Sequence, residues 1–306
     1  MTPYKWLFIN HFRRQAFDWR SDTPITHLKD ALREIKSVAR HEPTLAADGA
    51  IAFLEKLSPA LATVDSSSGA MVAAVSKAVD TLVPLIIKAE VTLAVRQHWL
   101  ERLWQALQSD GMAYIESLGN YWGELCVFPE LASSWADGLL PFLEHTWSLP
   151  SAEQGHYKGT TLCLSSLYGA KRYQELLVLL DKAPAKCWYQ RYWGVKALVS
   201  LGRKAEAIRY AEDSRSIQGA NYDQPIAQAC ETILLSSGLA EEAYQRYALV
   251  ATPNTTGLAM FRSLVKRYPG KPKEHILRDL MATTPNNPGK WLAALKAAGL
   301  AELASQ

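Results

Sequence analysis

The sequence predicts an all-α protein folded as a right-handed α–α superhelix, that is, a solenoid of antiparallel helix pairs. Three observations lead to this prediction. Apolar residues recur every three to four positions over most of the 306 residues, which is the spacing of one helix face. Strand signals are nearly absent, and no sustained alternation of apolar and polar residues occurs. Short turns join the segments, and a helix–turn–helix unit recurs in the C-terminal half.

The first half of the chain, residues 22–150, carries a series of helix patterns without a clean period. One helix is expected to begin at Asp22, because Asp22-Thr23-Pro24 supplies a cap and a proline in the first turn. Another covers about 68–87, and Pro84 is expected to kink it or to split it in two. The other helices expected before the repeats are 45–62, 92–108, 112–127, 129–147 and 157–168.

A unit of helix, glycine turn and second helix occupies residues 192–208. Gly202 lies in the turn, and Ala207 follows five residues later, where only a small side chain lets two helices approach. The same spacing recurs at 226–247 with Gly238 and Ala243. Weaker copies are found at 160–180, where Tyr173 and Leu176 take the places of Lys204 and Ala207, and at 291–304, with Gly299 and Ala304. One further helix pair is expected at 257–268 and 273–283.

This unit resembles the tetratricopeptide repeat, which has the same glycine turn and small residue. The resemblance covers roughly 157–306, and residues 151–306 are assigned to tetratricopeptide-like helical repeats. The aromatic and Gly-Tyr signature of the family is only partly met. Residues 22–150 are assigned to HEAT-like helix pairs that continue the same stack. Residues 1–21 are assigned to an N-terminal aromatic and basic cap.

Composition narrows the class of protein. Hydrophobic residues make up 48% and charged residues 21%, as in an ordinary folded protein, and the net charge of +3 does not by itself indicate nucleic-acid binding. The chain has no signal-peptide pattern, membrane-span pattern, metal-ligand spacing or cofactor motif, so no membrane, metal or cofactor is expected. The widely spaced cysteines predict reduced thiols and a cytoplasmic location. They are Cys126, Cys163, Cys187 and Cys230.

In tetratricopeptide-like stacks the first helix of each pair lines a concave face that accepts a peptide. The resemblance places these residues on that face: Lys158, Thr161 and Ser165 from the first copy, Tyr189, Tyr192 and Lys196 from the second, and Gln228 and Thr232 from the third. Tyrosine offers contact area and lysine offers charge, which suits a peptide with an acidic group. The predicted function is a non-catalytic interaction scaffold or adaptor for a protein or peptide. The alternative is an ordinary groove lining with no specific partner.

The first 40 residues contain eight Lys or Arg and four acidic residues, and aromatic residues are interleaved with them. Aromatic rings with arginines can stack on bases and neutralise phosphates, so Arg13, Arg14 and Arg20 are candidate nucleic-acid contacts of a regulator. The alternative, which we favour, is that the aromatic residues seal the first helix pair while the arginines remain solvated.

Glu124 is the one candidate for an active site. It lies in the aromatic segment Tyr121-Trp122-Gly123-Glu124, and apolar surroundings would favour a protonated carboxyl that could act as a general acid. A structural hydrogen bond explains this residue equally well. No H-E-x-x-H, G-x-S-x-G or nucleophilic cysteine motif occurs, so catalysis is not expected and an enzyme is the second alternative.

The chain ends at Gln306, within the expected last helix, which would leave an apolar edge exposed. Three explanations are open: a very short last helix, truncation of a longer ancestor, or a second subunit that covers the edge. The third predicts a homodimer.

Overall fold

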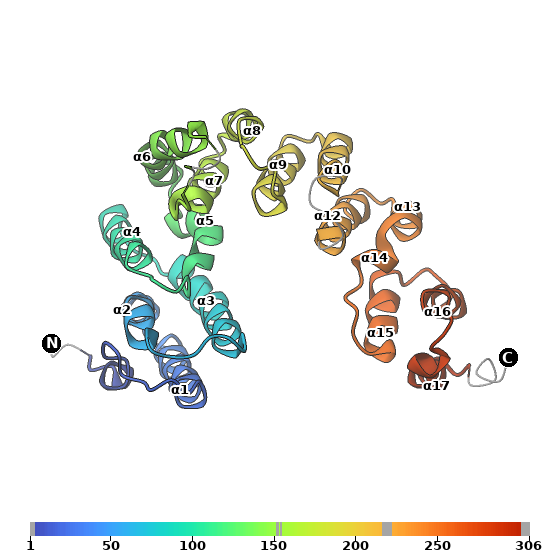
Figure 1. Ribbon diagram of the computed structural model, residues 1–306, viewed down its shortest axis with the longest axis horizontal. Helices are drawn as coiled ribbons and strands as arrows, with labels where there is room; N and C mark the ends of the chain where they lie inside the picture. The colour runs from blue at the N-terminus through green and yellow to red at the C-terminus, as the bar shows by residue number, and fades with distance from the viewer. Residues whose placement is uncertain (1–3, 151–152, 154, 216–221, 301–306) are drawn as a thin grey trace. The chain divides into compact units, whose positions relative to one another are not determined.

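The computed structural model describes residues 4–150, 153, 155–215 and 222–300. Within them the fold is all-α, as predicted, and no strand is present. The chain divides into two compact units, residues 1–184 and 185–306, here called the N-terminal unit and the C-terminal unit (Figure 1). The long helices of each unit follow the 3.6-residue spacing of apolar residues that the sequence shows.

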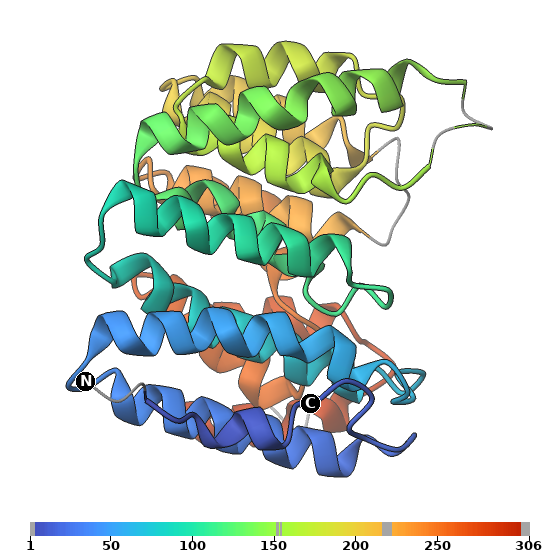
Figure 2. The same cartoon turned by 90° about the vertical axis from the view of Figure 1, so that its left-hand side faces the viewer.

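The N-terminal unit arranges its helices in two layers. Figure 2 looks onto one layer, in which α2, α4 and α6 lie side by side. The other layer is formed by α1, α3, α5 and α7 (Figure 1). The elements are η1 (Leu7–Asn10), α1 (Asp22–Val38), α2 (Pro43–Leu61), α3 (Ala70–Lys88), α4 (Leu93–Gln108), η2 (Glu116–Tyr121), α5 (Trp122–Cys126), α6 (Pro129–Ser148), α7 (Gly159–Gly169) and α8 (Tyr173–Asp181).

The C-terminal unit consists of helix pairs with α9, α12 and α15 on one side and α10, α13 and α16 on the other (Figure 1). Its elements are α9 (Trp188–Ser200), α10 (Lys204–Glu212), α12 (Asp223–Leu235), α13 (Ala240–Ala243), the π-helical turn η4 (Tyr244–Ala248), α14 (Leu249–Ala251), α15 (Gly257–Arg267), α16 (Lys273–Ala282), η5 (Pro288–Trp291) and α17 (Leu292–Ala298). The pair expected at 257–268 and 273–283 is confirmed.

The predicted glycine turns are also confirmed. Gly202, Gly238 and Gly299 have φ values of 76°, 75° and 74°, the left-handed conformation that glycine adopts without a Cβ clash. In the weaker copy at 160–180 the same place is taken by Lys171, with φ 60°. Each turn closes with the same pair of backbone hydrogen bonds, in which Gly202, for example, donates to Val199 and the next residue donates to Leu198. The small residues Ala207 and Ala243 are fully buried.

One expectation in the N-terminal unit is wrong. The single helix expected at 112–127 is replaced by η2 and the short α5. The change from η2 to α5 falls between Gly119 and Gly123, which both pack closely against α7. Of the two outcomes expected at Pro84, the split does not occur: α3 continues to Lys88, and its packing against α1 and α2 outweighs the one hydrogen bond that proline removes.

Helix α3 is also the one described helix long and apolar enough to cross a membrane, judged by length and composition alone. It packs against α1, α2 and α5, and the side chains from Met71 to Ile86 that face them are buried. Core helices of globular domains share this composition.

Three tyrosines of the C-terminal unit donate hydrogen bonds from their phenols to carboxylates of neighbouring helices. The pairs are Tyr244 with Asp279 (2.6 Å), Tyr247 with Glu212 (2.6 Å) and Tyr268 with Glu231. Burial, and next the bond to a carboxylate, raises the pKa of each phenol above its usual value near 10.

These raised pKa values predict that the C-terminal unit loses stability in alkaline solution. In the unfolded chain the phenols ionise near pH 10, whereas in the folded chain they keep their protons, so the stabilisation is complete below about pH 10 and is lost as the pH rises beyond it. Thermal unfolding should therefore show a melting temperature that falls between about pH 9 and pH 11. The Tyr247→Phe variant should have a shallower dependence. A flat profile for the wild-type protein would contradict this account.

Candidate binding groove

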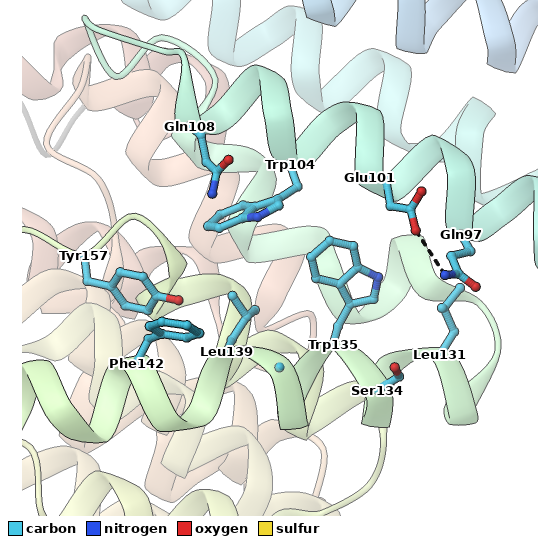
Figure 3. A pocket seen from close by; sticks show the side chains of 11 residues that line it. Gln97, Glu101, Trp104, Gln108, Leu131, Ser134, Trp135, Leu139, Phe142 and Tyr157 are labelled. Carbon is cyan, nitrogen blue, oxygen red and sulfur yellow. Dashed lines mark hydrogen bonds between the residues drawn. The ribbon is translucent and has the colours of Figure 1, made fainter.

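A groove opens between α4 and α6 of the N-terminal unit, and we call it the α4–α6 groove. Its volume is about 480 Å³, within the roughly 300–1,000 Å³ range of ligand pockets. It is lined by Gln97, Glu101, Trp104 and Gln108 of α4, by Leu131, Ser134, Trp135, Gly138, Leu139 and Phe142 of α6, and by Tyr157 (Figure 3).

Each helix contributes one continuous stripe of residues to this groove. On α4 the lining positions are 97, 101, 104 and 108, and on α6 they run from 131 to 142 in alternating steps of three and one. This is the spacing at which side chains share one helix face. The opposite face of α4 is apolar and buried, with Leu100, Leu103 and Leu107 in the core.

The groove exists because α4 is held by α2 and not by α6. Arg102 of α4 donates to Glu55 through two nitrogens (2.8 and 2.7 Å) and to Asp48 (2.8 Å), so its guanidinium fixes α4 against α2. Between α4 and α6 the closest ring contact joins Trp104 and Trp135, whose centroids are 6.4 Å apart in an edge-to-face arrangement. Two indoles of this size keep the helix backbones apart, because the distance between packed helices depends on the side chains at the contact.

Aromatic rings form most of the apolar wall. Trp104, Trp135 and Tyr157 are half-buried, and the Phe142 side chain is 63% exposed. Beneath Trp135 lies Trp122, which is fully buried, with its ring centroid 5.1 Å from that of Trp135. A large exposed aromatic side chain does not stabilise the fold by burial, so a contiguous group of such rings indicates a surface for a partner.

Gly138 lies near the middle of α6 and faces the groove. A Cβ atom built on it would meet no atom within 4 Å, so packing does not require glycine here. Glycine inside a helix costs about 0.5–1 kcal/mol relative to alanine. Its effect is to leave open the space above the helix, where a ligand backbone can approach closely.

The polar side chains of the groove are two amides (Gln97 and Gln108), one carboxylate (Glu101) and two hydroxyls (Ser134 and Tyr157). Glu101 is the only charged residue among the lining residues, and its carboxylate accepts a hydrogen bond from the Gln97 amide (3.0 Å; Figure 3). Tyr157 lies at the end of the groove away from Gln97 and Glu101 (Figure 3). Burial raises the pKa of Tyr157 to about 12, so its phenol is a hydrogen-bond donor at neutral pH. No lysine or arginine lines the groove among the described residues.

Of the three residues that the resemblance places in a concave face of the N-terminal unit, two hold the fold together. The Lys158 ammonium donates to the carbonyls of Leu107, Gln108 and Asp110, and so caps the C-terminal end of α4. Ser165 is only 2% exposed; its hydroxyl accepts from the Gly123 amide (2.9 Å) and donates to the Asn120 carbonyl (3.3 Å). The placement of Ser165 on a partner-binding surface is therefore wrong. Thr161 is half-buried against Gly119.

The other five predicted groove residues lie in the C-terminal unit. Tyr189 and Tyr192 are exposed on α9, and Lys196 is half-buried with its ammonium 4.2 Å from the centroid of the Trp193 ring. Gln228 and Thr232 are exposed on α12, which packs beside α9. Gln228 donates to the Ala251 carbonyl (2.9 Å), and Thr232 donates to the Gln228 carbonyl (2.7 Å). Their role in binding stays a prediction.

The N-terminal segment buries Trp6, Phe8 and Phe12 and exposes Arg13, Arg14 and Arg20. The buried rings pack on one another and on Phe53 of α2. The Arg20 guanidinium lies 5.6 Å from the centroid of the Trp19 ring, which is exposed as well. Nucleic-acid contact by these arginines stays a prediction.

The proposed general acid does not have the surroundings that it requires. Glu124 is exposed on α5, between the buried Gly123 and Leu125, and it lines none of the groove. The apolar pocket expected around its carboxyl is therefore wrong: the neighbouring Trp122 is buried in the core, whereas the Glu124 side chain is exposed.

The thiols of the described part of the chain form no disulfide with one another. Cys126 and Cys163 are buried, and burial raises the pKa of each thiol to about 12, so both remain protonated. Cys230 is buried too, and Cys187 is half-buried; all four are free thiols. No group of three or more His, Cys, Asp or Glu that could hold a metal ion occurs in the described ranges.

Sequence reasoning did not identify the α4–α6 groove. A signal was present in the spacing of Trp135, Gly138 and Phe142, which puts two aromatic residues and a glycine on one face of α6. The predicted homodimer edge concerns residues 301–306, which lie outside the described residues. No protein-family model, curated protein or solved structure matches this chain, so any account of its function depends on the geometry of the molecule itself.

Proposed function

We propose that this protein is an interaction scaffold, built as a solenoid of helix pairs, that binds an extended peptide segment of a protein partner in the α4–α6 groove. The observation that carries the proposal is the aromatic wall of the half-buried Trp104 and Trp135 and the exposed Phe142, beside the unfilled space over Gly138. Aromatic side chains dominate binding energy at protein interfaces, because they bury large areas and lose little conformational entropy.

The helix pairs support the solenoid part of the proposal. The turns at Lys171, Gly202, Gly238 and Gly299 have one geometry, and in two of them an arginine and a glutamate three residues later form the same two-bond ion pair. Repetition of one supersecondary unit is the basis of solenoid architecture, and solenoids present extended surfaces to partners.

An extended peptide lying in the groove fits this structure better than a strand added to a sheet does. The described residues contain no sheet edge on which a peptide could be added as a strand. The lining of amides and one phenol, with Gln97, Gln108 and Tyr157 at the rims, offers hydrogen bonds to a peptide backbone. A ligand backbone also gains from the missing side chain at Gly138.

Blocking the groove should abolish peptide binding without unfolding the protein. The Gly138→Leu variant fills the space over α6, and Phe142→Ala removes an exposed ring; each is expected to weaken binding by about tenfold or more. Binding is measured by incubating the purified chain with an immobilised library of ten-residue peptides and titrating those retained.

The matched control is Trp19→Ala, which also removes an exposed aromatic side chain from the N-terminal unit but lies outside the groove. This variant should retain wild-type affinity. Equal binding by the wild-type, Gly138→Leu and Phe142→Ala proteins would remove the groove from the account.

A further inference from the structure

We propose that the α4–α6 groove selects a peptide that carries an arginine side chain, whose guanidinium lies against the indole rings of Trp104 and Trp135 and pairs with the Glu101 carboxylate. This inference rests on the proposed function and names the chemistry of the peptide. The juxtaposition that carries it is one carboxylate beside two half-buried indoles in a groove whose described lining holds no positive charge (Figure 3).

Charge complementarity indicates that the bound part of the partner is positively charged. Glu101 is the single charged lining residue, and its one hydrogen bond comes from a neutral amide, so its negative charge is not neutralised within the groove. The faces of the indole rings are also negative, because aromatic rings carry a quadrupole. An acidic peptide would be repelled by both, whereas a cation would be attracted by both.

The two cations that adjoin lining residues in the sequence are held by other parts of the N-terminal unit. Lys158, which follows the lining residue Tyr157, donates its ammonium protons to the carbonyls at the end of α4. Arg102, which follows Glu101 on α4, faces α2 and is held by Asp48 and Glu55. The groove therefore has an acidic and aromatic site without an internal cation to fill it, and a partner has to supply one.

A guanidinium suits this place better than an ammonium. It is planar and more weakly hydrated than an ammonium, it stacks on aromatic faces, and its fork of N–H groups matches a carboxylate with two parallel hydrogen bonds. One of its remaining donors can pair with the amide oxygen of Gln97, whose amide nitrogen already donates to the Glu101 carboxylate. Lysine offers a point charge that loses more hydration in a half-buried groove.

The test compares peptides that differ only in charge at one position. Four pools of fluorescein-labelled ten-residue peptides carry arginine, its neutral isostere citrulline, lysine or glutamate at the fifth position, with the same mixture of small and apolar residues elsewhere. Fluorescence anisotropy is measured with the full chain, with Glu101→Gln, and with Glu130→Gln as the matched control, since Glu130 is an exposed acidic residue of α6 outside the lining.

We expect the wild-type protein and Glu130→Gln to bind the arginine pool about tenfold more tightly than the citrulline pool, and Glu101→Gln to bind the two within about threefold. Equal affinity for arginine and citrulline pools, with binding still lost in Phe142→Ala, overturns the arginine preference and leaves the peptide groove intact. Tighter binding of the lysine or glutamate pool also overturns it. Failure of every pool to bind removes both the inference and the groove.

Discussion

Replacing Gly123 by alanine is expected to lower the free energy of unfolding of the N-terminal unit by about 3 kcal/mol or more. A Cβ atom on Gly123 would lie 2.1 Å from the Ser165 carbonyl oxygen, and one on Gly169 would lie 2.7 Å from the Cα of Gly123. The contact joins two backbones, α5 and α7, so no side-chain rotation relieves it. The Gly123 amide also donates to the Ser165 hydroxyl, a bond that any separation of the helices would break.

Urea unfolding followed by circular dichroism measures this effect. Gly138→Ala is the matched control, because it is the same substitution in a helix of the same unit with open space around the new atom. That variant should be more stable than the wild type by about 0.5–1 kcal/mol. The packing account fails if the two variants have similar stability.

The same crossing also positions the groove. Trp122 precedes Gly123 on α5, and its ring supports that of the groove residue Trp135. The distance between α5 and α7 therefore affects the position of Trp135 in the groove. A Gly123→Ala protein that still folds should therefore have an altered groove, with weaker peptide binding than the wild type.

Much of the C-terminal unit could be predicted from the sequence, because its signals are local. A turn in the left-handed conformation favours glycine at one position, and a close helix pair favours a small residue five positions later, so Gly202 and Ala207 indicate the geometry directly. The turn at Lys171 uses the same geometry without glycine, which explains why that copy was recognised only through its neighbours.

The groove and the break between η2 and α5 could not be predicted, because they depend on contacts between distant parts of the chain. Apolar spacing in 112–127 favours one helix, and it does not show that α7 approaches Gly119 and Gly123, between which η2 changes to α5. Ser165 lies on α7 at a position that repeat spacing assigns to a surface, yet α5 covers it. Spacing shows which residues share a face, but it does not show which helix packs there.

A second large effect is expected at Arg267 in the C-terminal unit. Arg267 pairs with the Glu231 carboxylate and also donates to the Thr252 hydroxyl, and so it joins α15 to α12 and to the end of α14. The Glu231 side chain is 4% exposed, and its second oxygen accepts from the Tyr268 phenol. Arg267→Met leaves a buried carboxylate without its counter-charge, which costs about 3–5 kcal/mol.

The double variant Glu231→Met with Arg267→Met distinguishes a buried charge from lost packing. Replacing both members of a buried ion pair by apolar side chains removes the cost of desolvating them, so the double variant should be more stable than Arg267→Met alone. The double-mutant cycle is measured by denaturant unfolding of the wild-type chain, Arg267→Met, Glu231→Met and the double variant. If the double variant is the least stable, the pair acts through packing of the arginine stem and the phenol, and Glu231 does not depend on Arg267 for its charge.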